Sequence, residues 1–121
     1  MPTLPTGKRF KINDSEFYFS VAETGVELMT GLRGATNLEG FDGMLFDFGC
    51  GFDPIMTPKG LQFPVDIAFI LESGEIVMLS QLDPMYGINQ KTDRSDIQYV
   101  LEVPVGFFEA NGIEIGTIIE L

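Results

Sequence analysis

The carboxylate of Asp66 is the most informative candidate for chemistry in this sequence. It lies in the run 65–71 (VDIAFIL), where a period of two puts it on one strand face with Ala68 and Ile70. A carboxylate on a largely apolar face must be hydrogen-bonded, paired with a cation, or shifted to a higher pKa. Asp66 is therefore either a ligand-orienting or general-base carboxylate, or a structural acceptor for loop N–H groups or an arginine.

Three further side chains could accompany Asp66. Asp47 lies at the end of a predicted strand over 43–48, and Arg33 lies at the end of a predicted helix. A buried Asp47–Arg33 pair that holds the helix to the sheet is the structural interpretation. In the functional interpretation Asp47, Arg33 and Glu102 are neighbours of Asp66 in a binding pocket.

Several kinds of catalytic and metal site are excluded by composition. The chain has no His and one cysteine, Cys50, which rules out imidazole or multi-thiolate zinc sites and every triad with a histidine base. Without a histidine to activate it, Cys50 is expected to be an inert small residue. No segment has the alternating Asp/Asn spacing of a calcium loop. We therefore expect no metal and no cofactor.

The length of 121 residues and the ordinary globular composition, 45% hydrophobic and 21% charged, predict one domain over 1–121 with a flexible N-terminal arm over 1–8. The net charge of −11 disfavours nucleic acid and anionic membrane surfaces as partners. The N-terminus lacks the residue order of a secretion signal, and the longest nearly apolar run, 65–71, is too short to span a bilayer. These features predict a soluble, cytoplasmic or otherwise intracellular protein.

Hydrophobic periodicity predicts the elements that would position these side chains. Alternation around the turn 13–15 indicates a β-hairpin, and Thr24 with Glu27 has the spacing of a capping box that opens a helix over 24–33. Strands are expected over 43–48, 65–71, 75–82, 97–103 and 117–121, with a polar loop over 83–96 and irregular chain over 49–60. A second helix over 105–110 would pack Phe107 and Phe108 on the sheet, or pack one of the two rings there and expose the other to a partner. The expected class is mainly β (β-rich α+β), with about seven strands and two short helices.

Four blocks of sequence occur in an order that is characteristic of one family. They are Gly31-Leu32 with Leu38, the runs 43–48 (GMLFDF) and 64–70 (PVDIAFI), and the run 99–106 (YVLEVPVG) followed by Gly112 and Gly116. In these blocks the chain resembles the Domain of Unknown Function 192 family over about residues 17–121. The resemblance implies a small curled sheet or barrel, and it implies no activity because the family has none firmly assigned.

The chain departs from the family pattern beside the aspartate strand. The family's Gly-Leu-Met-x-Arg is replaced by 31–35 (GLRGA), and its Phe-Trp-Met-Lys-Asn-Thr block by 55–61 (IMTPKGL). If the family shares a site built from those polar groups, this chain keeps Asp66 and lacks its companions. The departures favour a binding or structural role over catalysis.

Two functions are therefore predicted. The leading hypothesis is a non-catalytic binding or assembly domain that contacts a protein partner or a second copy of itself. One version of this hypothesis is a phage decoration protein located in the virion. The alternative is a small-molecule binding or hydrolytic protein with a pocket around Asp66.

Overall fold

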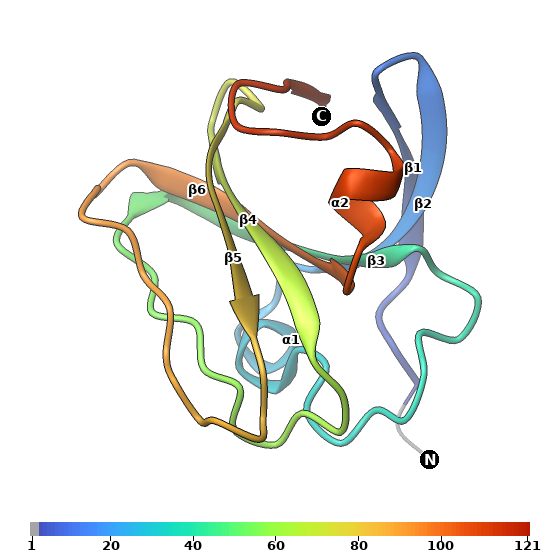
Figure 1. The fold of residues 1–121 in the computed structure, drawn as a ribbon, viewed down its shortest axis with the longest axis vertical. Coiled ribbons are helices and arrows are strands. Elements are labelled where there is room, and N and C mark those ends of the chain that lie inside the picture. The colour runs from blue at the N-terminus through green and yellow to red at the C-terminus, as the bar shows by residue number, and fades with distance from the viewer. Residues whose placement is uncertain (1–2) are drawn as a thin grey trace.

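The computed structural model describes residues 3–121 as one seven-stranded sheet, strongly curled, with two short helices (Figure 1). The strand order is β5-β4-β6-β3-β2-β1-β7, and β2–β3 is the parallel pair among otherwise antiparallel neighbours. The expected class, strand number and helix number are confirmed. The elements are β1 (Gly7–Ile12), β2 (Ser15–Ala22), α1 (Gly25–Thr30), β3 (Gly43–Phe52), β4 (Val65–Leu71), β5 (Ile76–Leu82), β6 (Ile97–Pro104), α2 (Phe107–Ala110) and β7 (Ile119–Glu120).

The N-terminal hairpin forms as predicted. Asn13 and Asp14 make its turn with φ of 51° and 66°, values that Asn and Asp tolerate better than most residues. The predicted flexible arm over residues 1–8 is too long at its C-terminal end, because Gly7 and Lys8 already pair with β2. The carbonyl of Thr6 also accepts a backbone hydrogen bond from β2. Residues 1–2 lie outside the described residues.

Helix α1 begins with the predicted capping box. The Thr24 hydroxyl accepts the N–H of Glu27, and the Glu27 carboxylate accepts the N–H of Thr24. The helix ends at Thr30 rather than at residue 33, because Gly31 leaves the helical conformation with φ 49°. A Cβ on Gly31 would lie 2.8 Å from the ring of Phe46, so glycine lets the helix end pack closely on β3.

Strand β3 is longer than predicted. The sequence predicts irregular chain from residue 49, whereas the strand continues to Phe52 through a register shift between Asp47 and Phe52. Gly49 lies inside this irregularity with φ 80°, a conformation that glycine adopts at little cost. Beyond the shift, Phe52 pairs with Ile97 of β6.

Two hydrophobic clusters cover the two faces of the central strands. We call the face that carries Leu45, Leu101 and α2 the α2 face, and the opposite face, covered by α1 and the segment 53–64, the α1 face. Phe108 is buried in the first cluster and Phe107 packs against it, which confirms their predicted packing on the sheet. Each central strand thus has apolar residues on both sides.

The chain between Ile113 and Glu120 joins the two ends of the curled sheet. Ile76 at the start of β5 donates its N–H to the Thr117 carbonyl, and Glu75 bridges to Ile118. The next residue, Ile119, pairs with Ile12 of β1. The predicted last strand, 117–121, is shorter because its first part makes these contacts with the β4–β5 turn.

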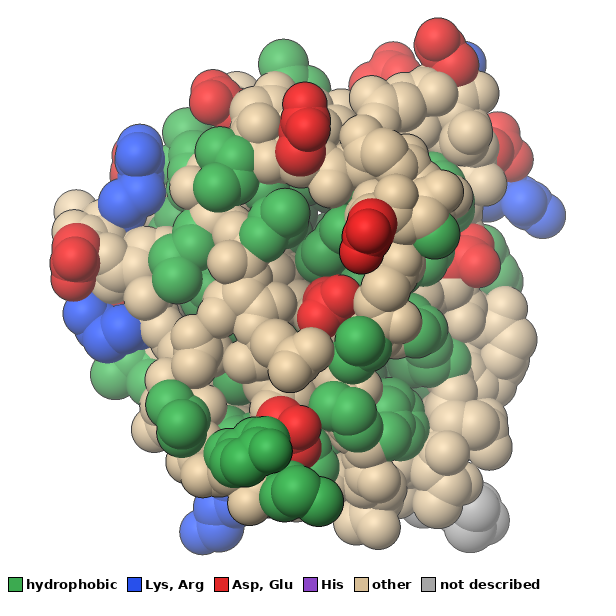
Figure 2. Space-filling view, viewed as in Figure 1, with side chains coloured by type: hydrophobic (Ala, Val, Ile, Leu, Met, Phe, Trp, Pro, Cys, Tyr) green, Lys and Arg blue, Asp and Glu red, His purple; other side chains and the backbone are tan. Residues whose placement is uncertain are grey.

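Acidic side chains are spread over the face drawn in Figure 2, and basic ones lie near its outline, in keeping with the net charge of −11. Within residues 3–121, no helix has the length and apolar character needed to cross a membrane. The loop 83–96 runs beside the segment 53–64 (Figure 1), and Met56 pairs with Gln90 in an isolated bridge between them.

Candidate functional site

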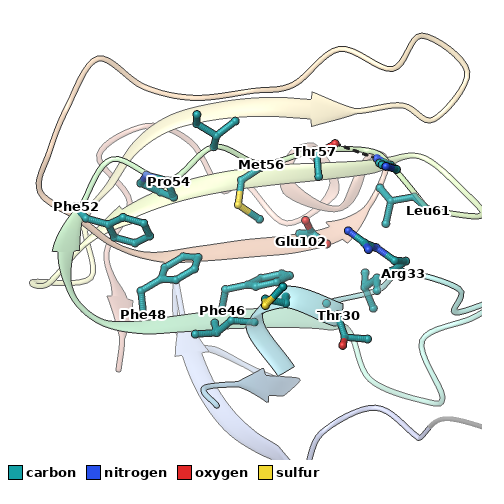
Figure 3. Close-up of a pocket in the computed structure, with 16 residues that line it drawn as sticks. Thr30, Arg33, Phe46, Phe48, Phe52, Pro54, Met56, Thr57, Leu61 and Glu102 are labelled. Carbon is teal, nitrogen blue, oxygen red and sulfur yellow. Dashed lines mark hydrogen bonds between the residues drawn. The ribbon is translucent and has the colours of Figure 1, made fainter. Parts of the chain in front are cut away.

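A pocket of about 330 Å³ lies on the α1 face, between the end of α1, strand β3 and the segment 54–61 (Figure 3). Its volume falls within the range of small-molecule sites. Apolar side chains provide most of its wall, namely Leu28, Met29, Leu32, Phe46, Phe48, Phe52, Pro54, Ile55, Met56 and Leu61. The polar and charged side chains on the lining are Thr30, Arg33, Thr57, Lys59 and Glu102.

Glu102 is the buried acid of this pocket. It lies in the middle of β6, between Met44 of β3 and Ile67 of β4, and only 3% of its surface is exposed. Its carboxyl group points into the pocket (Figure 3), and Oε1 has no hydrogen-bond partner among the described residues. Burial raises the pKa of Glu102 to about 8. At neutral pH most Glu102 side chains are therefore protonated.

Alternation along β6 places Glu102 on the α1 face. Val100 lies on the same face, whereas Leu101 and Val103 belong to the cluster on the α2 face. Glu102 thus occupies a position that packing alone would give to an apolar residue. An unpartnered buried carboxyl group costs stability, which makes it a candidate for function.

Two cations lie on the exposed part of the pocket lining. Arg33 follows α1 and extends toward Glu102 (Figure 3), yet no ion pair joins their charged groups within 4 Å. The stem of Arg33 packs over Gly60, where a Cβ would collide with it. Lys59 is the second cation, and its backbone N–H donates to the Thr57 hydroxyl. Neither side chain has an acidic partner within residues 3–121.

Asp66 lies on the opposite side of the sheet and acts as a structural acceptor. Its Oδ2 accepts a hydrogen bond from the backbone N of Gly106, with the two atoms 2.9 Å apart. Its Oδ1 accepts a hydrogen bond from Nε2 of Gln81, 3.2 Å away. Gly106 is the N-cap residue of α2, so the carboxylate ties β4 to the start of that helix. Asp66 does not line the pocket on the α1 face.

Asp47 is also separate from the pocket. Its Oδ1 accepts the N–H of Gly49 at 3.0 Å, inside the irregular part of β3. It forms no ion pair with Arg33, contrary to the structural interpretation of these two residues. Asp47 pairs with Tyr99 and lies on the α2 face, whereas Arg33 lies on the α1 face.

The four predicted site residues are therefore divided by the sheet. Asp66 is opposite Val103 in the β4–β6 register, while Glu102 is opposite Ile67. Neighbouring residues of one strand point to opposite faces, so the two carboxyl groups cannot share a pocket. Asp66 and Asp47 lie on the α2 face, and Arg33 and Glu102 on the α1 face.

A model of the family described as "Uncharacterized ACR", DUF192, matches residues 8–121. The chain belongs to the DUF192 family. This confirms the resemblance that the sequence blocks indicate. No curated protein matches the chain significantly.

Solved structures share the fold of this DUF192 chain. One, described as a "putative transcription regulator" from Sinorhizobium meliloti 1021, has a TM-score of 0.87 and 23% identity, with 99% of this chain and 97% of that chain covered. A protein of unknown function from Novosphingobium aromaticivorans DSM 12444 has a TM-score of 0.81 and 20% identity, with 95% and 85% covered. At these identities the similarity establishes the fold alone.

Part of the apolar wall of the DUF192 pocket could not be predicted from the sequence. Phe52, Pro54 and Met56 belong to the segment 49–60, which is expected to be irregular, and no periodicity marks them as neighbours of Glu102. The signal that could have identified the site is Glu102 itself, an acid in the apolar run 97–103, as Asp66 is in 65–71. Cys50 is exposed on β3 and does not line the pocket. Within residues 3–121, no group of three or more His, Cys, Asp or Glu could hold a metal ion.

Proposed function

We propose that this DUF192 protein is a non-catalytic binding domain whose pocket on the α1 face takes a small molecule with an apolar body and a hydrogen-bonding group. The observation that carries the proposal is the unpartnered Oε1 of Glu102 inside an otherwise largely apolar pocket. Buried polar atoms in proteins are nearly always hydrogen-bonded. A ligand that bonds to this oxygen would remove the cost of leaving it unpaired, and the apolar wall would bind the rest of the ligand.

Binding without turnover is favoured by the separation of the acids. Acid–base hydrolysis by carboxyl groups commonly uses two that face the same bond. Glu102 faces the pocket, while Asp66 and Asp47 face the other side of the sheet and are hydrogen-bonded to backbone N–H groups. The hydrolytic version of the alternative prediction therefore receives no support.

A role in protein contact has separate support. Met85, Tyr86 and Ile88 on the loop 83–96 expose 82%, 70% and 62% of their surface. Large exposed apolar side chains that cluster are typical of contact surfaces. A binding domain of this kind could belong to an assembly, including the virion predicted from the sequence, or to a regulator like the one named for its structural neighbour. Native mass spectrometry tests this role: a discrete oligomer supports it and a bare monomer counts against it.

Nuclear magnetic resonance tests the pocket directly, with benzyl alcohol as a neutral probe that has a ring and one hydroxyl group. Methyl resonances of Leu28, Leu61 and Met56 should shift in a saturable manner, because these side chains line the pocket. Ile76 and Ile119, buried on the α2 face, provide the control inside the same molecule. Shifts that do not saturate, or that are equal on both faces, would refute the proposed function.

A further inference from the structure

We infer that the natural ligand of this pocket is a small zwitterion with an apolar body, such as an α-amino acid with an aromatic or aliphatic side chain. The inference rests on the proposed function and adds the chemical class of the ligand. It comes from three features of one cavity: a buried carboxyl group without a partner, two cations at the exposed part of the lining, and a wall of Phe, Leu and Met side chains.

Glu102 is the part of the site that selects an amine. Its Oε1 is buried, unpartnered and directed into the cavity (Figure 3). The residues on either side of it in the sheet, Met44 and Ile67, are apolar and offer no N–H from their side chains. A ligand ammonium group is a strong donor to such an oxygen, since charge-assisted hydrogen bonds are about twice as strong as neutral ones. Phe46 and Phe48 supply ring surfaces on the same lining, which also favour a cation.

Arg33 and Lys59 are the part of the site that selects an anionic group. Both line the cavity, and neither has an acidic partner within residues 3–121. A ligand that carried only an ammonium group would be repelled by these two charges. A ligand that also carries a carboxylate pairs with them, and a guanidinium binds a carboxylate through two parallel hydrogen bonds. An α-amino acid places both groups on one carbon atom, next to its apolar side chain.

Binding of the ammonium group should release a proton from Glu102. The other charged groups on the cavity lining are Arg33 and Lys59, and burial raises the pKa of Glu102 to about 8. About one carboxyl group in ten is ionised at pH 7 and about one in a hundred at pH 6, and only this form pairs with an ammonium. The proton leaves Oε for the solvent as the ligand N–H bonds form. The affinity for a zwitterion should therefore rise about tenfold from pH 6 to pH 7.

Isothermal titration calorimetry with three probes of similar apolar body tests the inference. The probes are L-phenylalanine, 2-phenylethylamine and 3-phenylpropanoate, which carry both charges, the amine alone and the carboxylate alone. L-Phenylalanine should bind about tenfold more tightly than either of the others at pH 8, because each lacks one charge-assisted contact. Its heat of binding should depend on the buffer, since a proton is released. Tighter binding of 3-phenylpropanoate, with affinity that falls as pH rises, would overturn the inference.

Two pairs of matched variants assign the contacts. Glu102→Gln should lower the affinity for L-phenylalanine about tenfold and abolish proton release, whereas Asp66→Asn, which removes an acid from the other face, should change neither. Arg33→Gln should lower the affinity for L-phenylalanine to that for 2-phenylethylamine, whereas Lys8→Gln, at an exposed residue of β1, should not. Equal effects within either pair would overturn the inference.

The outcomes also separate this inference from the proposed function. If benzyl alcohol binds in the pocket and L-phenylalanine does not, the pocket binds small molecules but the zwitterion assignment is wrong. If neither probe binds, both the assignment and the proposed function are wrong.

Discussion

Replacement of Glu102 by Gln should remove a large part of the pH dependence of stability. Burial raises the pKa of Glu102 from its ordinary value of 4.5 to about 8. Between these pH values the folded protein holds a proton that the unfolded chain has released, so rising pH favours unfolding. The contribution of protonated Glu102 to the free energy of unfolding is fully present below pH 4.5 and is lost as pH rises through 8. The shift corresponds to about 5 kcal/mol in total, of which about 3 kcal/mol is lost by pH 7.

Urea denaturation of the wild type and the Glu102→Gln variant, from pH 4.5 to pH 8.5, measures this effect. The difference in unfolding free energy should grow by about 3 kcal/mol in favour of the variant between pH 4.5 and pH 7. Glu109→Gln makes the same substitution at an exposed position and serves as the control. Parallel curves for wild type and variant would refute the reasoning. If the wild type instead becomes more stable relative to the variant as pH rises, Arg33 forms an ion pair with Glu102 in solution.

Two further predictions concern residues that shape the fold around the site. Asp66→Ala should cost about 1–3 kcal/mol in thermal denaturation because the N–H that begins α2 loses its acceptor, whereas Asp93→Ala, at a fully exposed side chain, should cost almost nothing. Gly60→Ala should lower the free energy of unfolding more than Gly87→Ala does. Both glycines have positive φ (85° and 66°), so alanine at either position carries a strain of about 1–2 kcal/mol. A Cβ at residue 60 also collides with Arg33, while the space around residue 87 is open, so equal urea midpoints would contradict this account.

The parts of the fold that sequence patterns predict are those set by neighbours along the chain. Thr24 and Glu27 bond to each other three residues apart, and the turn at Asn13 and Asp14 follows from side chains that tolerate positive φ. Strand alternation over 65–71 also depends on adjacent residues only. Each of these features could therefore be predicted without knowledge of the tertiary structure.

The pocket depends on relations between strands, which a single sequence does not contain. Alternation puts Asp66 and Glu102 each on a definite face of its own strand, but the register between β4 and β6 decides whether the two faces coincide. From the sequence, Gly49 could either end a strand or form a bulge. Because Phe52 pairs with β6 beyond Gly49, the strand continues through a bulge. The same pairing brings Phe52 into the wall of the pocket. The candidate residues Arg33 and Glu102 could be named in advance, but their separation from Asp66 and Asp47 could not.

The closure of the sheet by the segment 113–120 has a consequence for folding kinetics. Lys11 pairs with Glu120, and Ile12 with Ile119, so the last strand of the chain pairs with the first. The central pairs β3–β6 and β4–β6 also join segments that are far apart in the chain. Chains dominated by such non-local pairs fold slowly for their size, in roughly milliseconds to seconds, because long loops must close before the pairs form. Stopped-flow refolding of this protein should therefore be slower than that of a helical bundle of the same length.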